Sequence, residues 1–330
     1  MSIIYQNNIM NSNKIRTIFL GTPDFAVASL ETLIAAPEFK VIAIITQPDK
    51  KIGRHQELVP PPIKKIAAKH HIEVYQPEKI KTEVDKIKSL KPDLIVVTAY
   101  GQIIPSSILE IPTYGCVNVH GSLLPKYRGA ACLQAPILNG NRYSGVTIMK
   151  MDAGLDTGPI LKQAKIKLGQ EETVETLHDK LSALGAKVLI PTLIKYCAGK
   201  LKAKKQNSHR ASYVKMLKKE DGKIDWHLPA KKIERMVRAL NPWPGTYCLL
   251  HRPDLKINSV LFKILAVRPK IIKIKRHIPG EIFNHNGALA VKSSHDQALI
   301  ISKLQLEGRK AMDVDEFLRG NKGIYGSILK

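Results

Sequence analysis

The amino-acid sequence predicts an α/β fold, in which a doubly wound, mostly parallel sheet is followed by a smaller β-barrel domain. In the first 200 residues, short apolar runs of strand length alternate with stretches of helical periodicity, the pattern of βαβ units. Beyond residue 210 the apolar runs are short and are separated by Gly, Pro and Asn, as in small barrels. The 330 residues are 44% hydrophobic and 24% charged, which excludes intrinsic disorder.

The elements of the first domain follow one another in strand–helix order. Residues 1–14 are polar and irregular, and we expect a loose extension. The first strand, at 15–20, ends in Gly21-Thr22-Pro23-Asp24, where Thr22 before Pro23 is typical of an N-cap followed by proline at the first helical position. Further elements are predicted as strands at 41–46, 94–99, 116–120, 145–151 and 160–168, and as helices at 63–70, 78–90 and 173–196.

The pattern changes near residue 200 and divides the chain into a first domain, 15–199, and a C-terminal domain, 211–330. Residues 200–210 are basic and lack apolar periodicity, so they are interpreted as a linker. The elements predicted beyond it are one helix at 230–240 and strands at 247–250, 259–267, 287–291 and 298–304.

Positive charge is concentrated in the last part of the chain. Lys and Arg number 52 against 28 Asp and Glu, and residues 201–330 hold 27 and 11 of these. A polyanion such as nucleic acid or anionic lipid is therefore a plausible partner. We expect Lys202, Lys204 and Lys205 to contact phosphates, although a Lys-rich composition or a solvated linker would give the same pattern.

Four scattered cysteines without CxxC spacing argue against a disulfide framework or a structural zinc, and favour a reducing cytoplasm. No window approaches 18 uncharged apolar residues, so no membrane span is expected. Residues 1–13 contain no Lys or Arg, which argues against a targeting peptide.

The strand at 116–120 carries the first candidates for chemistry. Asn118 and His120 are two residues apart, so both project to one face, at the carboxyl end where open α/β sheets bind ligands. An amide beside an imidazole suits a reaction with a developing oxyanion, although a lone strand histidine is often structural. A carboxylate could come from the Gly-rich turn 151–158, through Asp152 or Asp156, or either could form a solvated Asx-turn.

The chain resembles the folate-dependent formyltransferase family across residues 15–330. The matching motifs, in family order, are Gly21-Thr22-Pro23-Asp24-Phe25, Thr46-Gln47-Pro48-Asp49, Asn118-Val119-His120-Gly121-Ser122-Leu123-Leu124-Pro125, Tyr127-Arg128-Gly129-Ala130-Ala131, Gly145-Val146-Thr147-Ile148-Met149, Met151-Asp152-Ala153-Gly154-Leu155-Asp156-Thr157-Gly158 and Asn241-Pro242-Trp243-Pro244-Gly245.

This resemblance implies a Rossmann-like catalytic domain, a C-terminal barrel related to OB folds, and formyl transfer from 10-formyltetrahydrofolate to the amino group of initiator methionyl-tRNA. Asn118, His120 and Asp156 match the family's catalytic trio, and Arg54 matches its contact to the acceptor end. No metal is implied, and a monomer is expected. The turn that matches the family's folate contact consists of Ser122, Leu123, Leu124 and Pro125.

Two departures from the family pattern stand out. Cys132 replaces a proline after the Arg128 motif, which removes some rigidity from a helix start. The loop 47–62 is less basic than usual, because Arg54 is followed by His-Gln-Glu; Arg54 could therefore be an incidental surface residue. Trp243, between two prolines, is interpreted as a packed interdomain anchor rather than a stacking platform.

Alternative functions remain at this point. A relative that formylates an amino sugar or glycinamide ribonucleotide would share the trio, but it would not need a basic C-terminal domain. A nucleic-acid-binding protein without activity would explain the charge and predicts no folate binding. A nicotinamide dehydrogenase is disfavoured, because the turn at Gly21 is not GxGxxG.

Overall fold

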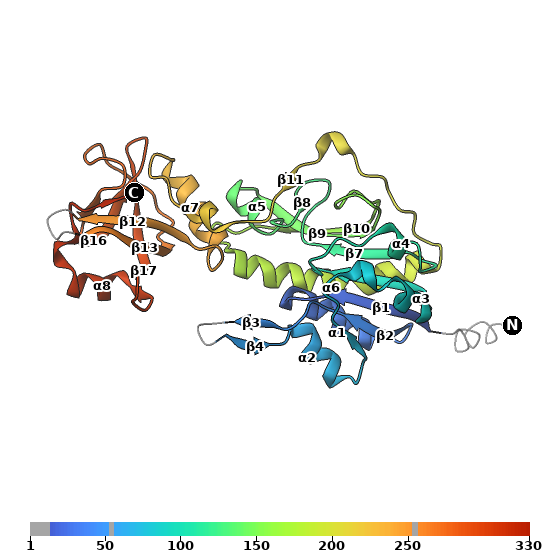
Figure 1. Ribbon diagram of the computed structural model, residues 1–330. Helices are drawn as coiled ribbons and strands as arrows, with labels where there is room; N and C mark the ends of the chain where they lie inside the picture. The colour runs from blue at the N-terminus through green and yellow to red at the C-terminus, as the bar shows by residue number, and fades with distance from the viewer. Residues whose placement is uncertain (1–13, 53–55, 253–256) are drawn as a thin grey trace. The chain divides into compact units, whose positions relative to one another are not determined.

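The computed structural model describes residues 14–52, 56–252 and 257–330, and its contacts divide them into two compact units (Figure 1). Unit 1 consists of the described residues through Gly129, together with Gly145–Ile166 and His178–Tyr213. Unit 2 consists of Ala130–Ser144, Lys167–Leu177 and Val214–Lys330. The main boundary thus follows Tyr213, and the segment 200–210 that we interpreted as a linker belongs to unit 1.

A seven-stranded sheet forms the centre of unit 1, in the order β10, β9, β7, β6, β1, β2, β5 (Figure 1). The strands are β1 (Ile15–Gly21), β2 (Phe39–Ile45), β5 (Val74–Tyr75), β6 (Leu94–Thr98), β7 (Cys116–His120), β9 (Tyr143–Lys150) and β10 (Ile160–Lys167). β1 pairs in parallel with β2 and β6, and β6 in parallel with β7, whereas β7 and β9 are antiparallel. This confirms the doubly wound, mostly parallel sheet.

Helices pack against the sheet and fix the position of its strands. They are α1 (Val27–Ala35), α2 (Pro62–Lys69), α3 (Val84–Ser89), α4 (Ser106–Leu109) and α6 (Val174–Cys197), with the 3-10 turns η1 (Asp24–Ala26), η2 (Ile80–Thr82) and η3 (Ser208–Arg210). A Cβ added to Gly185 of α6 would lie 2.9 Å from the side chain of Val119 on β7. A larger residue at Gly185 would therefore displace the Val119 side chain on the strand that carries Asn118 and His120.

Two local predictions in unit 1 were wrong. Thr22 does not cap a helix; its hydroxyl donates to the carbonyl of Tyr100 at 2.9 Å, because β1 and β6 are neighbours and end side by side. The N-cap of η1 is Pro23. The helix expected over 78–90 is instead η2 followed by the shorter α3.

A β-hairpin occupies the loop at 47–62, with antiparallel strands β3 (Lys50–Ile52) and β4 (Glu57–Val59). Arg54 lies outside the described residues. At the base of the hairpin, the Asp49 carboxylate accepts hydrogen bonds from Gln76 Nε2 at 2.7 Å and Lys64 Nζ at 2.8 Å. These bonds hold the pKa of Asp49 below its ordinary value and tie the hairpin to α2.

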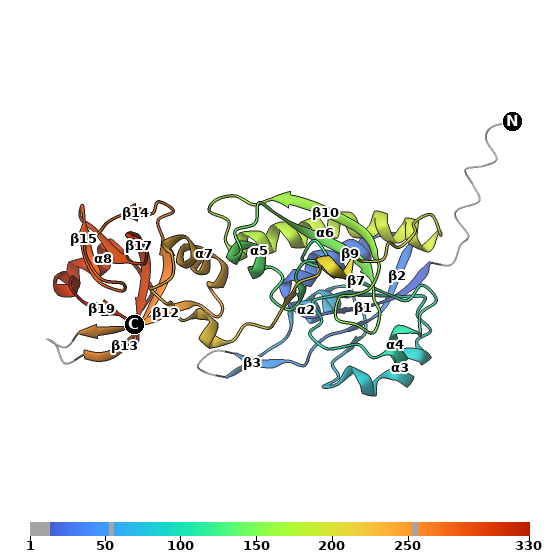
Figure 2. The same cartoon turned by 90° about the horizontal axis from the view of Figure 1, so that it is seen from above.

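Unit 2 contains an antiparallel sheet in the order β15, β16, β17, β13, β12, β19. Figure 2 labels β12, β13, β15, β17 and β19 of this sheet. The strands are β12 (Thr246–Arg252), β13 (Ile257–Val267), β14 (Ile272–Lys273), β15 (Ile282–His285), β16 (Ala288–Lys292), β17 (Gln297–Leu306), β18 (Met312–Asp313) and β19 (Ile328–Leu329). A bridge between Glu281 and Ile328 joins its two ends. The sheet therefore closes into a barrel, as predicted, around a core that includes Trp226, Phe262 and Phe317.

The remaining elements are α5 (Gln134–Leu138), α7 (Ala230–Leu240), α8 (Val314–Gly320), β8 (Arg128–Gly129), β11 (Tyr213–Val214), η4 (Lys219–Gly222) and η6 (Lys322–Ile324). Trp243, which we expected to pack as an interdomain anchor, is 62% exposed, whereas Trp226 of the core of this unit is 3% exposed. None of the helices in the described part of the chain has the length and apolar character needed to cross a membrane.

Candidate active site

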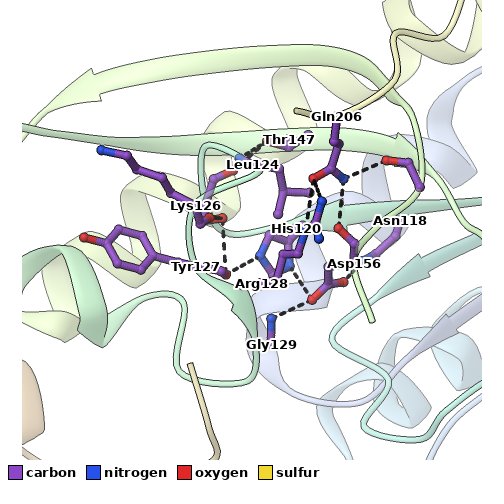
Figure 3. Close-up of polar contacts among 12 residues, drawn as sticks. Asn118, His120, Leu124, Lys126, Tyr127, Arg128, Gly129, Thr147, Asp156 and Gln206 are labelled. Carbon is purple, nitrogen blue, oxygen red and sulfur yellow. Dashed lines mark hydrogen bonds and ion pairs between the residues drawn. The ribbon is translucent and has the colours of Figure 1, made fainter. Parts of the chain in front are cut away.

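The carboxyl end of β7 brings Asn118 and His120 to one face of the sheet, as their spacing predicted (Figure 3). β7 lies between β6 and β9, with Asn118 opposite Met149 and His120 opposite Thr147. The strand order reverses between β1 and β6, next to this position. In open α/β sheets, ligands bind where the order reverses, so the pair occupies the part of the sheet where a substrate is expected.

The imidazole of His120 is buried and its orientation is fixed. Nε2 lies 3.0 Å from the carbonyl oxygen of Tyr127. Because a carbonyl only accepts, Nε2 carries a hydrogen in this contact. Nδ1 is then the nitrogen that faces the carboxylate of Asp156, at 3.7 Å from Oδ2.

Asp156 joins the pair from the turn that follows β9. Its Oδ2 accepts from the backbone N–H of Gly129 at 2.8 Å, and its Oδ1 lies 3.5 Å from Asn118 Nδ2. Its φ of 54° is in the left-handed region, which aspartate tolerates better than most residues. The three side chains that the resemblance indicated thus lie together.

Asp152, the alternative carboxylate of this turn, is used locally and is exposed. Its Oδ1 accepts from the N–H of Gly154 at 3.1 Å and from the hydroxyl of Thr157 at 2.5 Å. This is the Asx-turn that we considered for either aspartate, and it directs the Asp152 side chain to the turn itself.

The turn Ser122–Pro125 directly follows β7 and is held by two side chains that sequence reasoning did not single out. The Thr147 hydroxyl donates to the Ser122 carbonyl at 2.6 Å and accepts from the Leu124 N–H at 3.1 Å. Gln163 Nε2 donates to the Leu124 carbonyl at 2.8 Å. Ser122 and Leu124 are buried, whereas Leu123 and Pro125 are half-buried, so a ligand would meet Leu123, Pro125 and backbone groups.

The three lysines that we predicted to contact phosphates lie in the segment that follows α6. Lys202, Lys204 and Lys205 are exposed. The backbone of Lys204 exchanges two hydrogen bonds with Ile160, at 2.7 and 2.8 Å, so the segment runs along β10. Its cationic side chains are therefore presented to solvent from a fixed backbone.

Two further side chains complete the polar network and were missed from sequence. Gln206 is buried, although the residues on both sides of it are exposed. It bonds to the guanidinium of Arg128 and to the backbone of Asp156 (Figure 3). Arg128 was visible as part of a motif, but neither charge nor periodicity indicated its partner.

The thiol of Cys116, on the strand that carries Asn118 and His120, is poorly suited to covalent chemistry. Burial raises the pKa of Cys116, at the start of β7, to about 12. Cys132 is half-buried in unit 2. Within the ranges described, no group of three or more His, Cys, Asp and Glu side chains could hold a metal ion.

The chain matches known proteins along nearly its whole length. The family model described as "Formyl transferase" matches residues 13–193, and "Formyl transferase, C-terminal domain" matches 216–322. A methionyl-tRNA formyltransferase from Geobacter sulfurreducens is 46% identical over 93% of this chain and 94% of its own. One from Lachnospira eligens is 44% identical over 95% and 99%.

Among solved structures, the N-formyltransferase from Helicobacter canadensis in complex with folinic acid and dTDP-3-aminofucose has a TM-score of 0.63, covering 88% of this chain and 99% of that one. At 20% identity this is a likeness of fold. The family models and the relatives with more than 40% identity establish the relationship: this chain belongs to the formyl transferase family.

Proposed function

We propose that this chain transfers the formyl group of 10-formyltetrahydrofolate to the α-amino group of initiator methionyl-tRNA, for the initiation of translation. One observation carries the proposal. Asn118, His120 and Asp156 meet at the carboxyl end of β7 in a chain that is 46% identical, over 93% of its length, to a methionyl-tRNA formyltransferase.

The reaction requires positioned donors and one proton transfer. The neutral α-amine attacks the formyl carbon, a carbon–nitrogen bond forms, and the formyl oxygen gains negative charge. The amide N–H of Asn118 and the imidazole of His120 would stabilise that oxygen. The bond from the carbon to N10 of the folate then breaks, and N10 takes a proton.

Asp156 and His120 together can move that proton. The Asp156 carboxylate would take it from the attacking amine, directly or through water, and pass it to His120 Nδ1, which lies 3.7 Å from Oδ2. The imidazolium that forms would then give the Nδ1 proton to N10, which leaves the carboxylate and the neutral imidazole as they began. Atoms and charges then balance without any further reactant.

The folate would bind beside the turn Ser122–Pro125. The turn is fixed by Thr147 and Gln163, and rigid positioning of this kind lowers the cost of ordering a bound substrate. Leu123 and Pro125 offer apolar surface, and the backbone offers hydrogen-bonding groups for a heterocycle.

The tRNA would bind through cationic groups. Residues 201–330 carry 27 Lys and Arg against 11 Asp and Glu, and exposed Lys202, Lys204 and Lys205 lie at the start of this part. Arg54, which lies outside the described residues, would contact the acceptor end. This charge supports a tRNA acceptor over a small amino sugar.

We further propose that the enzyme works in the cytoplasm as a monomer. Charged initiator tRNA is used where translation begins, and four cysteines that form no disulfide fit a reducing compartment. Asn118, His120 and Asp156 all come from one chain, so a single copy would suffice for the chemistry.

The test is incubation of the protein with 10-formyltetrahydrofolate and methionyl initiator tRNA, followed by deacylation and detection of formyl-methionine. We expect product to depend on both substrates. Uncharged tRNA, which lacks the α-amine, is the negative control, and a nucleotide-linked amino sugar serves as the alternative acceptor in a parallel reaction. Product from the amino sugar, with none from the tRNA, would contradict the proposed acceptor.

Arg54→Ala is expected to raise KM for the tRNA by about tenfold, the loss of roughly one charge-assisted hydrogen bond to a phosphate, with KM for the folate unchanged. The measurement is initial rate over a range of tRNA concentrations. Lys69→Ala removes an exposed charge from α2 of the same unit and is the control. Equal kinetics for Arg54→Ala and the parent would make Arg54 an incidental surface residue.

Replacing Lys202, Lys204 and Lys205 together by alanine is expected to weaken tRNA binding and make it less sensitive to salt. The slope of log affinity against log salt should become shallower by up to about three units, since each duplex phosphate neutralised contributes about −0.9. Initiator and other tRNAs should lose affinity alike, because backbone contacts carry little sequence information.

The control for this triple variant is the replacement of Lys65, Lys69 and Lys81, three exposed lysines of unit 1. It changes the net charge equally but lies outside the proposed contact segment. If the two triple variants have the same salt slope, the segment 200–210 is only solvated.

A further inference from the structure

A buried arginine lies one residue before the backbone group that holds Asp156. Arg128 is 2% exposed, and its guanidinium donates to Gln206 Oε1 from Nε at 3.1 Å and from Nη2 at 2.9 Å. Its Nη1 donates to the hydroxyl of Tyr213 at 2.7 Å. Burying a cation against neutral oxygens costs desolvation free energy, and the hydrogen bonds to Gln206 and Tyr213 offset part of that cost.

The side-chain amide of Gln206 forms four hydrogen bonds, two with Arg128 and two with the turn that carries Asp156. Oε1 accepts the two Arg128 bonds, and Nε2 donates to the carbonyls of Asp156 at 2.8 Å and Gly158 at 2.7 Å. The amide can take only this orientation, because a guanidinium has only donors and a carbonyl only accepts. Arg128 therefore directs the amide N–H groups of Gln206 at the turn.

Asp156 depends on such support from its surroundings. Its backbone has φ of 54°, a conformation that persists in non-glycine residues when neighbouring groups hold it. Gln206 holds its carbonyl, and the N–H of Gly129, the residue after Arg128, holds its carboxylate at 2.8 Å. One short segment, Arg128–Gly129, thus fixes both the backbone and the side chain of Asp156.

We propose that Gln206, oriented by Arg128, is a positioning residue that holds Asp156 against His120 for formyl transfer; this inference rests on the role of Asp156 in the proposed function. Gln206 itself does not touch the reacting atoms. Without it the turn relaxes, and the 3.7 Å approach of Asp156 Oδ2 to His120 Nδ1 is lost. The effect falls on the chemical step, since Gln206 is buried and its side-chain amide bonds to Arg128 and to the backbone of the turn.

The test compares Gln206→Met with Gln206→Glu in the full-length protein. Methionine keeps the length and removes all four bonds, and kcat should fall by about 10–100-fold, as expected for a misplaced catalytic group, with KM for both substrates within about twofold. Glutamate keeps a charge-assisted partner for Arg128, so the protein should stay folded. It sets an oxygen against the carbonyls of Asp156 and Gly158, so kcat should fall as well.

Gln297→Met is the matched control. Gln297 lies in unit 2, where its Oε1 accepts from the N–H of Ala230 at 3.1 Å, so its loss should lower stability without changing kcat. If Gln206→Met fails to fold, Gln206→Glu carries the test alone. A kcat equal to that of the parent in either folded variant would overturn the inference.

A double-mutant cycle separates positioning from a merely structural role. In the Asp156→Asn background, the carboxylate that Gln206 positions is already gone, so adding Gln206→Met should lower kcat by less than about threefold. Independent losses that multiply would overturn the inference. If the unmutated protein forms no formyl-methionine, the proposed function is contradicted. A normal rate in Asp156→Asn would contradict both the catalytic role of Asp156 and the positioning role of Gln206.

Discussion

Replacing His120 with alanine is expected to slow formyl transfer by about 10²–10³-fold, the loss that follows removal of one oxyanion donor or general acid. Asn118→Ala should have an effect of the same size. Both side chains act on charge that develops during the reaction, so KM for the folate and for the tRNA should change by no more than about twofold. Single-turnover rates with saturating substrates measure the chemical step directly.

His178→Ala is the matched control for His120→Ala. His178 is another histidine of unit 1 beside carboxylates, with Nε2 3.2 Å from Asp24 Oδ1 and Nδ1 2.9 Å from Asp179 Oδ1. It lies on α6, and its removal should leave the rate near that of the parent. A near-normal rate in His120→Ala would exclude the oxyanion and proton-donor roles for that residue.

The fold could be predicted where periodicity and burial agree. β6 is buried at all five positions, and such continuous apolar runs are typical of parallel strands covered on both faces. The long helix α6 was predicted within one residue at each end. In these elements the local pattern and the tertiary environment favour the same structure, so the sequence alone was sufficient.

Elements that depend on distant partners could not be predicted in this way. β19 is two residues long and exists because Ile328 and Leu329 pair with β12. β15 is four residues long, and the N–H of its Ile282 bonds to the carbonyl of Ser327. Thr22 has the residue type of an N-cap, but the neighbouring strand offered the Tyr100 carbonyl instead. These contacts join residues that are far apart in sequence, so a short stretch of sequence cannot predict them.

In the candidate site, too, some residues could be predicted from local spacing and others depend on partners far away in sequence. Asn118 and His120 are two residues apart on one strand, so the alternation of side chains was enough to bring them together. Gln206 is a single buried amide between exposed Lys205 and Asn207, and its partners Arg128 and Asp156 are far away in sequence. Spacing also could not choose between Asp152 and Asp156, because their difference arises from the bend of the turn toward Gly129.

Asp156→Asn is expected to lower the rate about as much as the loss of His120, by roughly 10²–10³-fold. Asparagine has nearly the same shape, tolerates φ of 54°, and can still accept the hydrogen bond from the N–H of Gly129 through its oxygen. It cannot take a proton from the attacking amine. Thermal unfolding should therefore stay close to that of the parent while single-turnover formylation falls.

Asp152→Asn makes the same chemical change four positions earlier in the same turn and is the matched control for Asp156→Asn. The amide oxygen of asparagine can still accept from the N–H of Gly154 and the hydroxyl of Thr157, as the carboxylate does now, so the turn should persist and the rate should stay within about threefold of the parent. If Asp152→Asn is the slow variant and Asp156→Asn the normal one, the proton acceptor is Asp152. The contacts of Asp156 with Gly129 and Asn118 would then be structural only.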